Sequence, residues 1–214
     1  MFHEALNEKC LEIYIDRVKN IDLIWVEQFL DIISERICSD SYFRLNDIGC
    51  NLGQFWKGLK KREWGKNINY FGYDCDDLYL EEAKKVFSEI SDNLFKFDVT
   101  QEKPPECDIT VCSATLEHLE NLQPGLDNML QSTRKLFLLR TFLGEETLCS
   151  KRMIEDAKVP YNVHQFSFRE LFLALEKNGF SSKVIRDKYT DSMPVYLDDG
   201  MIRTIFIVAG SKVQ

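Results

Sequence analysis

The chain has 214 residues, of which 44% are hydrophobic and 29% are charged, a composition typical of a folded protein with one domain-sized core. Its formal net charge of −8 argues against nucleic acid as a partner, because phosphate groups would be repelled. No apolar run reaches the roughly 18 residues that cross a bilayer, and no signal-peptide pattern is present, so we expect a cytoplasmic protein without a membrane partner.

Helices and strands are predicted to alternate along most of the chain. Apolar residues at helical spacing predict two amphipathic helices between residues 10 and 37. A strand at 42–48 is then expected to lead through a glycine-containing loop into a helix at 54–62. Further strands are predicted at 68–73, 94–97, 107–112 and 135–142, and further helices at 76–90 and 124–133.

The last third of the chain is less regular in its pattern. Residues 144–165 are expected to form an irregular connection. A helix at 168–178 and two strands at 182–187 and 202–209 follow, and the last two strands are expected to form an antiparallel hairpin.

This alternation predicts an α/β fold of the doubly wound type, because parallel neighbouring strands need crossover connections of helix length. We expect seven strands in a mainly parallel sheet, with the N-terminal helices and the C-terminal hairpin added to it. Ligands of such sheets bind beyond the carboxyl ends of the strands. Residues that directly follow each strand are therefore the candidates for a functional site.

The segment 47–53 (DIGCNLG) follows the first predicted strand and begins the next helix. Its glycines suit a backbone that turns sharply and approaches a ligand, although a turn that needs positive φ would explain them equally well. Asp74 ends the second strand about twenty residues later, where a carboxylate can bind ribose hydroxyls. An NAD-dependent oxidoreductase would share these features, but the GxGxxG pattern is incomplete, with Asn51 at its second glycine.

The sequence resembles the class I S-adenosylmethionine-dependent methyltransferases over roughly residues 43–141. Their acidic-x-Gly-x-Gly-x-Gly loop is matched by residues 47–53, except that Asn51 stands in place of the middle glycine. Asparagine can adopt the left-handed backbone that this position needs. The resemblance implies S-adenosylmethionine as the cofactor and assigns its contacts to Asp47, Gly49, Asn51 and Gly53 in the loop, to Asp74 at the ribose, to Asp98 and Val99 at the adenine, and to Ser113 beside the methionine.

The stretch after the fourth strand, Leu116-Glu117-His118, is similar to the LEH motif of methyltransferases that act on small molecules. His118 is a candidate general base for a substrate hydroxyl, because its ordinary pKa is close to neutrality. Glu117 and His118 are equally well explained as partners of local hydrogen bonds. Some relatives bind a metal through a further glutamate three residues earlier; Ala114 stands there, and we expect no metal.

Other candidate residues lie outside the motifs. Tyr161, His164 and Gln165 place polar and aromatic groups before a helix, and His164 is a second candidate for catalysis, although packing at the rim of the sheet explains these residues as well. Arg140 suits either an anionic substrate group or a structural ion pair. The N-terminal apolar stripe, with Trp25 and Phe29, is expected either to cover the cofactor cleft or to pack in the core.

These residues predict a methyltransferase of one domain (1–214), with a helical cap at 1–40, a cofactor-binding core at 41–142 and a substrate-side part at 143–214. No Asn/Asp-Pro-Pro-Tyr/Phe motif follows the fourth strand, which favours an oxygen of a small metabolite or sugar-like molecule as the methyl acceptor. The alternatives are an NAD-dependent oxidoreductase and an inactive methyltransferase-like binding module. The sequence leaves the acceptor's identity and the oligomeric state open.

Overall fold

A computed structural model describes residues 8–36, 41–153, 159–197 and 202–213. Within these residues, no helix combines the length and the apolarity that a membrane span requires. The elements run in the order α2 Glu8–Asn20, α3 Ile24–Ser34, β1 Phe43–Ile48, α4 Gln54–Leu59, η1 Glu63–Asn67, β2 Ile68–Asp74, α5 Asp77–Val86, η2 Ser88–Asn93, β3 Leu94–Lys96, β4 Cys107–Ser113, η3 Leu116–His118, α6 Leu122–Ser132, β5 Thr133–Gly144, β6 Leu148–Arg152, β7 Tyr161–Ser167, α7 Phe168–Lys177, β8 Phe180–Arg186, β9 Val195–Tyr196, β10 Ile202–Arg203 and β11 Ile205–Lys212.

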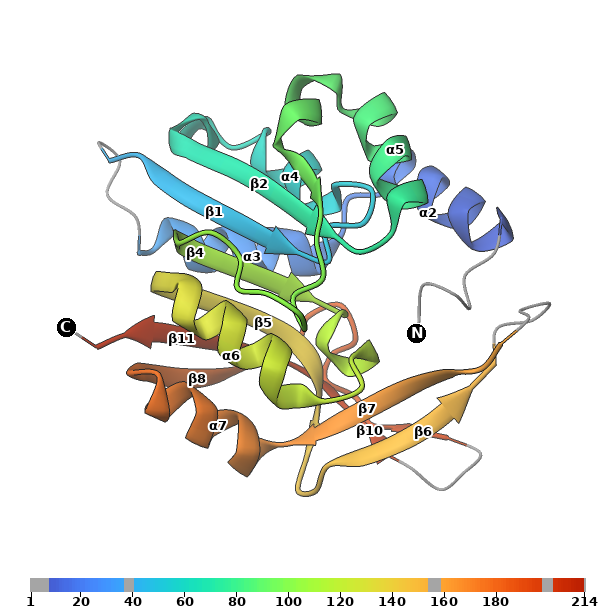
Figure 1. Cartoon of the computed structure of the whole chain (residues 1–214), viewed down its shortest axis with the longest axis vertical. Helices are drawn as coiled ribbons and strands as arrows, with labels where there is room; N and C mark the ends of the chain where they lie inside the picture. Colours follow the sequence, from blue (N-terminus) through green and yellow to red (C-terminus); the bar gives the residue numbers. More distant parts are fainter. Residues whose placement is uncertain (1–7, 37–40, 154–158, 198–201, 214) are drawn as a thin grey trace.

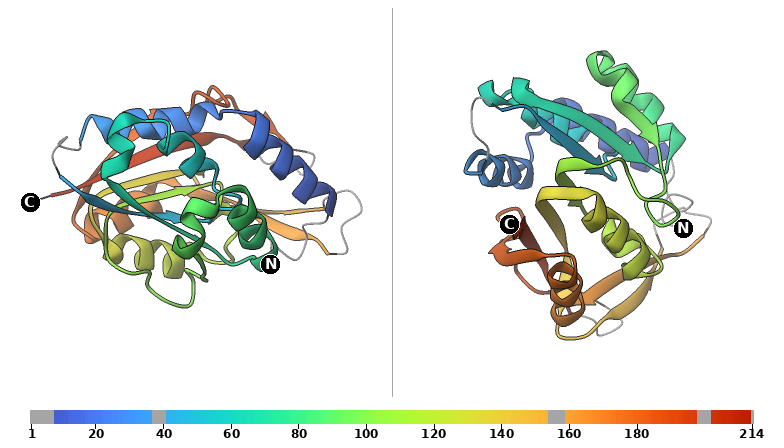
Figure 2. Two further views of the ribbon diagram at one scale, coloured as in Figure 1. Left: turned by 90° about the horizontal axis from the view of Figure 1, so that it is seen from above. Right: turned by 60° about the vertical axis from the view of Figure 1, so that its left-hand side comes forward.

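The predicted doubly wound sheet is confirmed. Seven strands follow the order β3-β2-β1-β4-β5-β11-β8, and the strands from β3 to β5 are parallel to one another. β11 is antiparallel to both β5 and β8, so the expected closing hairpin is also confirmed. Helices cover both faces, with α2 and α3 on one side and α6 and α7 on the other (Figures 1 and 2).

The prediction of an irregular connection at 144–165 is wrong. β7 pairs in parallel with the end of β5, and β6 pairs antiparallel with β7, which brings the sheet to nine strands. These two strands extend to the lower right of Figure 1. The apolar alternation that signals a strand is missing here because β7 buries polar side chains, including His164 and Gln165, which are hydrogen-bonded to backbone carbonyls.

The core has two parts, one on each face of the sheet. Along β5, Leu136 and Leu138 pack with α3 and α4, whereas Phe137 and Leu139 pack with α6 and α7. This follows from the two-residue period of a strand, which sends neighbouring side chains to opposite faces. A continuous apolar run was therefore the correct signal for a strand that is buried on both sides.

The register of the central strands places their carboxyl ends at one level. Ile48 at the end of β1 pairs with Tyr73 of β2 and with Cys112 of β4. The loops after these three strands consequently meet at the same edge of the sheet, which is where ligands bind in folds of this class.

Candidate active site

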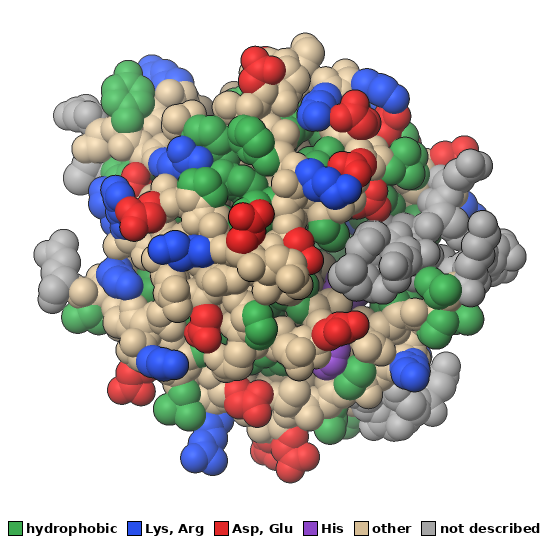
Figure 3. All heavy atoms as spheres, in the orientation of Figure 1, with side chains coloured by type: hydrophobic (Ala, Val, Ile, Leu, Met, Phe, Trp, Pro, Cys, Tyr) green, Lys and Arg blue, Asp and Glu red, His purple; other side chains and the backbone are tan. Residues whose placement is uncertain are grey.

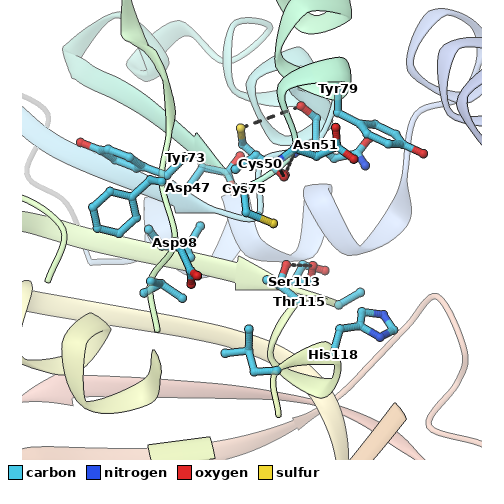
Figure 4. A pocket seen from close by; sticks show the side chains of 18 of the residues that line it. Asp47, Cys50, Asn51, Tyr73, Cys75, Tyr79, Asp98, Ser113, Thr115 and His118 are labelled. Carbon is cyan, nitrogen blue, oxygen red and sulfur yellow. Dashed lines mark hydrogen bonds between the residues drawn. The ribbon is translucent and has the colours of Figure 1, made fainter. Parts of the chain in front are cut away.

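A cavity of about 820 Å³ lies at this edge, between the loops that follow β1, β2, β3 and β4 and the helices α2 and α3. Its size is that of a site for a small molecule. Figure 4 shows Asp98 on one side of the pocket and His118 on the other, with Ser113 and Thr115 between them. The structure thus brings together nearly all of the cofactor-contacting residues that the sequence predicted.

The loop after β1 turns through three residues with positive φ. These are Gly49 (74°), Asn51 (50°) and Gly53 (79°), so Asn51 does take the left-handed conformation expected of it. A Cβ atom on Gly49 would lie 1.9 Å from the Thr115 hydroxyl oxygen, and no larger residue fits. Gly53 begins α4 and lies outside the residues that line the cavity. Its part is to turn the chain into the helix.

Asp74 ends β2 and lines the cavity. One carboxylate oxygen accepts the Asn51 N–H at 2.8 Å, and the other accepts the Asp76 N–H at 3.0 Å. Burial raises the pKa of Asp74, and these backbone hydrogen bonds act in the opposite direction. The carboxylate therefore ties the glycine loop to β2 and still has lone pairs for a ligand, since each oxygen accepts more than one hydrogen bond.

Asp47, the acidic residue that begins the loop motif, is buried beside the cavity. The Tyr70 hydroxyl donates to its carboxylate at 2.8 Å. Burial raises the pKa of Asp47 to about 7, against the lowering effect of the Tyr70 hydrogen bond, and the charge of Asp74 raises it further.

This raised pKa predicts a pH-dependent stability. Between about pH 4 and pH 7 the folded chain keeps a proton on Asp47 that the unfolded chain releases, so stability falls as the pH rises, by up to about 1.4 kcal/mol per pH unit. An Asp47→Asn variant has no carboxyl group here and so does not lose this stability. In urea denaturation, its free energy of unfolding should rise relative to that of the wild type from pH 5 to pH 7. An Asp92→Asn variant, changed at an exposed position, should differ from the wild type by the same free energy at both pH values. If the stabilities of the wild type and Asp47→Asn change with pH in the same way, the pKa of Asp47 is not raised.

The loop after β3 contributes Asp98 and Val99 to the cavity wall. One oxygen of Asp98 accepts from the backbone N–H of Thr100 at 2.9 Å and from its hydroxyl at 2.7 Å, which fixes the carboxylate at the rim. Val99 is buried and offers an apolar surface. A carboxylate edge next to an apolar face suits a planar base with an exocyclic amine.

The turn after β4 separates the two residues of the Glu117-His118 pair. Glu117 is buried, and its carboxylate accepts the Thr141 hydroxyl at 2.8 Å in the core. His118 lines the cavity, and its Nδ1 donates to the Asn162 carbonyl at 3.4 Å. Burial lowers the pKa of His118, which favours a neutral imidazole at neutral pH. The local hydrogen-bond interpretation thus holds for Glu117, whereas His118 remains a candidate base.

The structure does not bring the second histidine candidate, His164, to the cavity. Its ring is buried, stacks on Phe166 and donates from Nδ1 to the Glu117 carbonyl at 3.2 Å. Gln165 likewise lies outside the cavity lining and donates to the Glu146 carbonyl. Both side chains bind backbone carbonyls of neighbouring segments. His164 therefore does not line the cavity in which a substrate would bind.

Arg140 lines the cavity but is also half of a buried ion pair. Its Nε and Nη2 donate to the two Asp187 oxygens at 3.0 and 3.1 Å. Asp187 also accepts the Thr190 hydroxyl, so the pair anchors the loop that carries Tyr189 to the cavity. The structural interpretation of Arg140 is therefore correct.

Several cavity residues were missed because they carry no motif. They come from the N-terminal helices, the start of α4 and α5, and the loop after β8: Tyr14, Arg17, Gln54, Tyr79 and Tyr189. Trp25 lines the cavity whereas Phe29 packs in the core, so each alternative for the apolar stripe holds for one of them. The buried Tyr79 hydroxyl and Gln54 Nε2 have no hydrogen-bond partner within the described residues, as is common where a ligand supplies the partner.

Negative charge predominates around the cavity. Six acidic side chains line it, namely Asp47, Asp74, Asp76, Asp98, Glu102 and Glu120, against three cationic side chains, Arg17, Lys96 and Arg140. Asp47 contributes its charge only above about pH 7, the value to which burial raises its pKa. Two of the cations are paired with acids, Lys96 with Asp77 and Arg140 with Asp187. On the face drawn in Figure 3, basic side chains lie among acidic ones and do not gather in one patch. The cavity is therefore suited to a cationic ligand.

A family model described as "Methyltransferase domain" matches residues 46–135, the segment that contains every one of the loops after β1 to β4. A search of curated protein sequences finds no match.

Solved structures with the same fold include three methyltransferases. An S-adenosylmethionine-dependent methyltransferase from Clostridium acetobutylicum is similar over 96% of this chain and 98% of its own, with a TM-score of 0.67 and 12% identity. Magnesium protoporphyrin IX methyltransferase from Synechocystis with bound S-adenosylmethionine covers 97% and 85%, with a TM-score of 0.59 and 14% identity. 1,6-Didemethyltoxoflavin-N1-methyltransferase from Burkholderia thailandensis is similar over 90% of this chain and 80% of its own, with a TM-score of 0.59 and 12% identity. The TM-scores establish a shared fold, and at identities this low the likeness extends no further than the fold.

Proposed function

We propose that the chain methylates an oxygen of a small metabolite or sugar-like acceptor, because a family model of a methyltransferase domain matches residues 46–135 and because the chain shares the fold of S-adenosylmethionine-dependent methyltransferases. The observation that carries the site is the hydrogen bond between the Asn51 N–H and Asp74. It joins the loop that would hold the methionine part of the cofactor to the carboxylate that would bind its ribose.

The residues of the cavity fit S-adenosylmethionine. The cofactor is a cation, and the surplus of carboxylates around the cavity favours positive charge. Because Gly49 has no Cβ atom, the loop after β1 can approach Thr115 in the turn after β4 closely, which brings two walls of the cavity together. Asp74 ends β2 and Asp98 lies on the loop after β3, where the ribose and the adenine would bind. We propose these contacts, together with Ser113 beside the methionine, as the cofactor site.

S-adenosylmethionine, when bound, supplies a methyl group that is already activated on a positively charged sulfur. The work left to the chain is to hold the acceptor oxygen in line with that methyl group and to keep water out. His118 would take the proton of the acceptor hydroxyl as the new oxygen–carbon bond forms. With Nδ1–H donating to the Asn162 carbonyl, the neutral ring carries its lone pair on Nε2.

Two observations support an oxygen acceptor. At the end of β4 the sequence reads Ser113, Ala114, Thr115 and Leu116, where many nitrogen-directed enzymes have an Asn/Asp-Pro-Pro-Tyr/Phe motif. A neutral histidine at the cavity can accept the proton that a hydroxyl must lose. The aromatic side chains of Tyr14, Trp25 and Tyr189 supply walls for a small, partly apolar molecule.

A nitrogen acceptor is the second candidate, because two structures with this fold are named as N-methyltransferases. The two candidates predict different products from the same protein. Incubation with S-adenosylmethionine labelled in its methyl group, together with a panel of small alcohols, phenols and amines, separates them by the acceptors that become labelled.

Calorimetry provides the first test of the proposal. We expect S-adenosylmethionine and S-adenosylhomocysteine to bind, and NAD not to bind. Absence of binding at high micromolar concentration of either nucleoside would contradict the proposed function and favour an inactive binding module. Binding of NAD alone would favour an oxidoreductase.

A further inference from the structure

The turn that carries His118 is held in an unusual backbone conformation. Ala114, the first residue after β4, has φ of +53°, which is costly for a residue with a Cβ atom. The Ala114 N–H donates to the Arg140 carbonyl at 2.9 Å, and Thr115 packs directly on Gly49 of the cofactor loop. Such strain persists only where the surrounding structure fixes the backbone.

β7 provides the fixation on the other side of the turn. His164 Nδ1 donates to the Glu117 carbonyl at 3.2 Å, and the Asn162 carbonyl accepts from His118 Nδ1 at 3.4 Å. The Tyr161 ring meets the His118 ring edge to face, with 5.8 Å between the centroids. One strand thus contacts the turn both at its backbone and at the imidazole of the candidate base.

His164 is itself rigidly placed. The residue is 8% exposed, and its ring is nearly parallel to the Phe166 ring, with an interplanar angle of 11°. Its backbone belongs to the β6–β7 ladder, opposite Cys149. The Glu117 side chain is fixed independently by the Thr141 hydroxyl of β5. The His164 hydrogen bond therefore joins two rigid elements, β7 and the turn after β4.

We propose that His164 is a positioning residue, which holds the Glu117 carbonyl and thereby fixes the orientation of His118 in the cavity. This inference rests on the proposed function, in which His118 accepts the proton of the methyl acceptor. In this proposal the buried His164 acts through the Glu117 carbonyl and His118, because His164 itself does not line the cavity.

A variant pair separates positioning from packing. His164→Asn keeps an N–H donor close to the place of Nδ1, whereas His164→Leu fills the space without a donor. Both variants remove the imidazole, so any electrostatic effect of His164 on His118 is lost equally in the two. Glu117, Tyr161, Arg203 and the Asn162 carbonyl, which also face His118, are unchanged in both. The difference between the variants isolates the hydrogen bond to the Glu117 carbonyl.

The measurement is the titration of His118 by NMR of imidazole resonances. The chain has only three histidines, so each signal is assignable by single replacement. In His164→Leu we expect the turn to loosen and the depressed pKa of His118 to return toward the ordinary histidine value, because the ring gains water. His164→Asn, which keeps the hydrogen bond, should shift the His118 pKa less than His164→Leu does. Equal His118 titrations in the two variants would overturn the proposal.

Two controls keep the test decisive. S-adenosylhomocysteine binding is measured on each variant by calorimetry, and failure of the wild type to bind would count against the proposed function, whereas the NMR result judges the role of His164 by itself. If His164→Leu does not fold, His164→Gln, whose amide is displaced by one methylene, replaces it. With an acceptor in hand, loss of the hydrogen bond should lower kcat at least about tenfold with little change in KM, and His164→Asn should restore it.

Discussion

Replacing Asp74 by Ala is expected to weaken binding of S-adenosylhomocysteine by about 1–3 kcal/mol, the usual cost of losing hydrogen bonds to a charged group. The carboxylate is proposed to bind the ribose hydroxyls, and it also accepts the N–H groups of Asn51 and Asp76. The variant therefore removes both a ligand contact and the hydrogen bond that ties the glycine loop to β2. Isothermal calorimetry measures the loss directly.

Matched variants distinguish the two effects. Asp92→Ala removes an exposed carboxylate outside the cavity lining and should leave the affinity unchanged. Asp74→Asn keeps one carbonyl oxygen as an acceptor for a backbone N–H but loses the negative charge, so its affinity should lie between those of the wild type and the alanine variant. An Asp74→Ala protein that binds as tightly as the wild type would refute the ribose assignment.

The sequence was most informative where backbone geometry and buried strands restrict the choice of residue. The left-handed positions at Gly49 and Gly53 require residues that tolerate positive φ, and Asn51 meets the same need. The buried runs of β4 and β5 reflect burial on both faces of the sheet. Together with Asp74 at the end of β2 and Asp98 after β3, they were sufficient to predict the sheet, the loop and the wall of the cavity that these residues line.

The rest of the cavity wall could not be predicted in the same way, because it is assembled by tertiary contact. Tyr14 and Arg17 reach the cavity only because α2 packs at the carboxyl end of the sheet, and nothing in their spacing distinguishes them from other helix residues. The β6–β7 hairpin was missed since its buried polar side chains are satisfied by partners far away in sequence, as His164 is by Glu117. Residue type alone did not separate His118, which faces the cavity, from His164.

The buried ion pair of Arg140 and Asp187 is expected to have the largest effect on stability. Asp187→Ala leaves the Arg140 side chain, which is 6% exposed, without its carboxylate partner, and removing one partner of such a pair costs about 3–5 kcal/mol. The exposed pair of Arg134 and Glu106 is the matched control, and Glu106→Ala should cost less than about 1 kcal/mol. Urea denaturation at pH 7 gives both values.

The pH dependence of the stability of Asp187→Ala tests whether the charge of Asp187 causes the stabilisation. Burial works against the charged form of Asp187, but the hydrogen bonds from Arg140 and Thr190 outweigh it and lower the pKa of Asp187 in the folded chain. Its contribution to stability is then present above the unfolded pKa of about 4 and is lost as the pH falls through the lower folded value. The gap between wild type and Asp187→Ala should therefore narrow below pH 4. A gap at pH 7 no larger than that of Glu106→Ala would mean that the loop carrying Tyr189 is held to the cavity by something other than this ion pair.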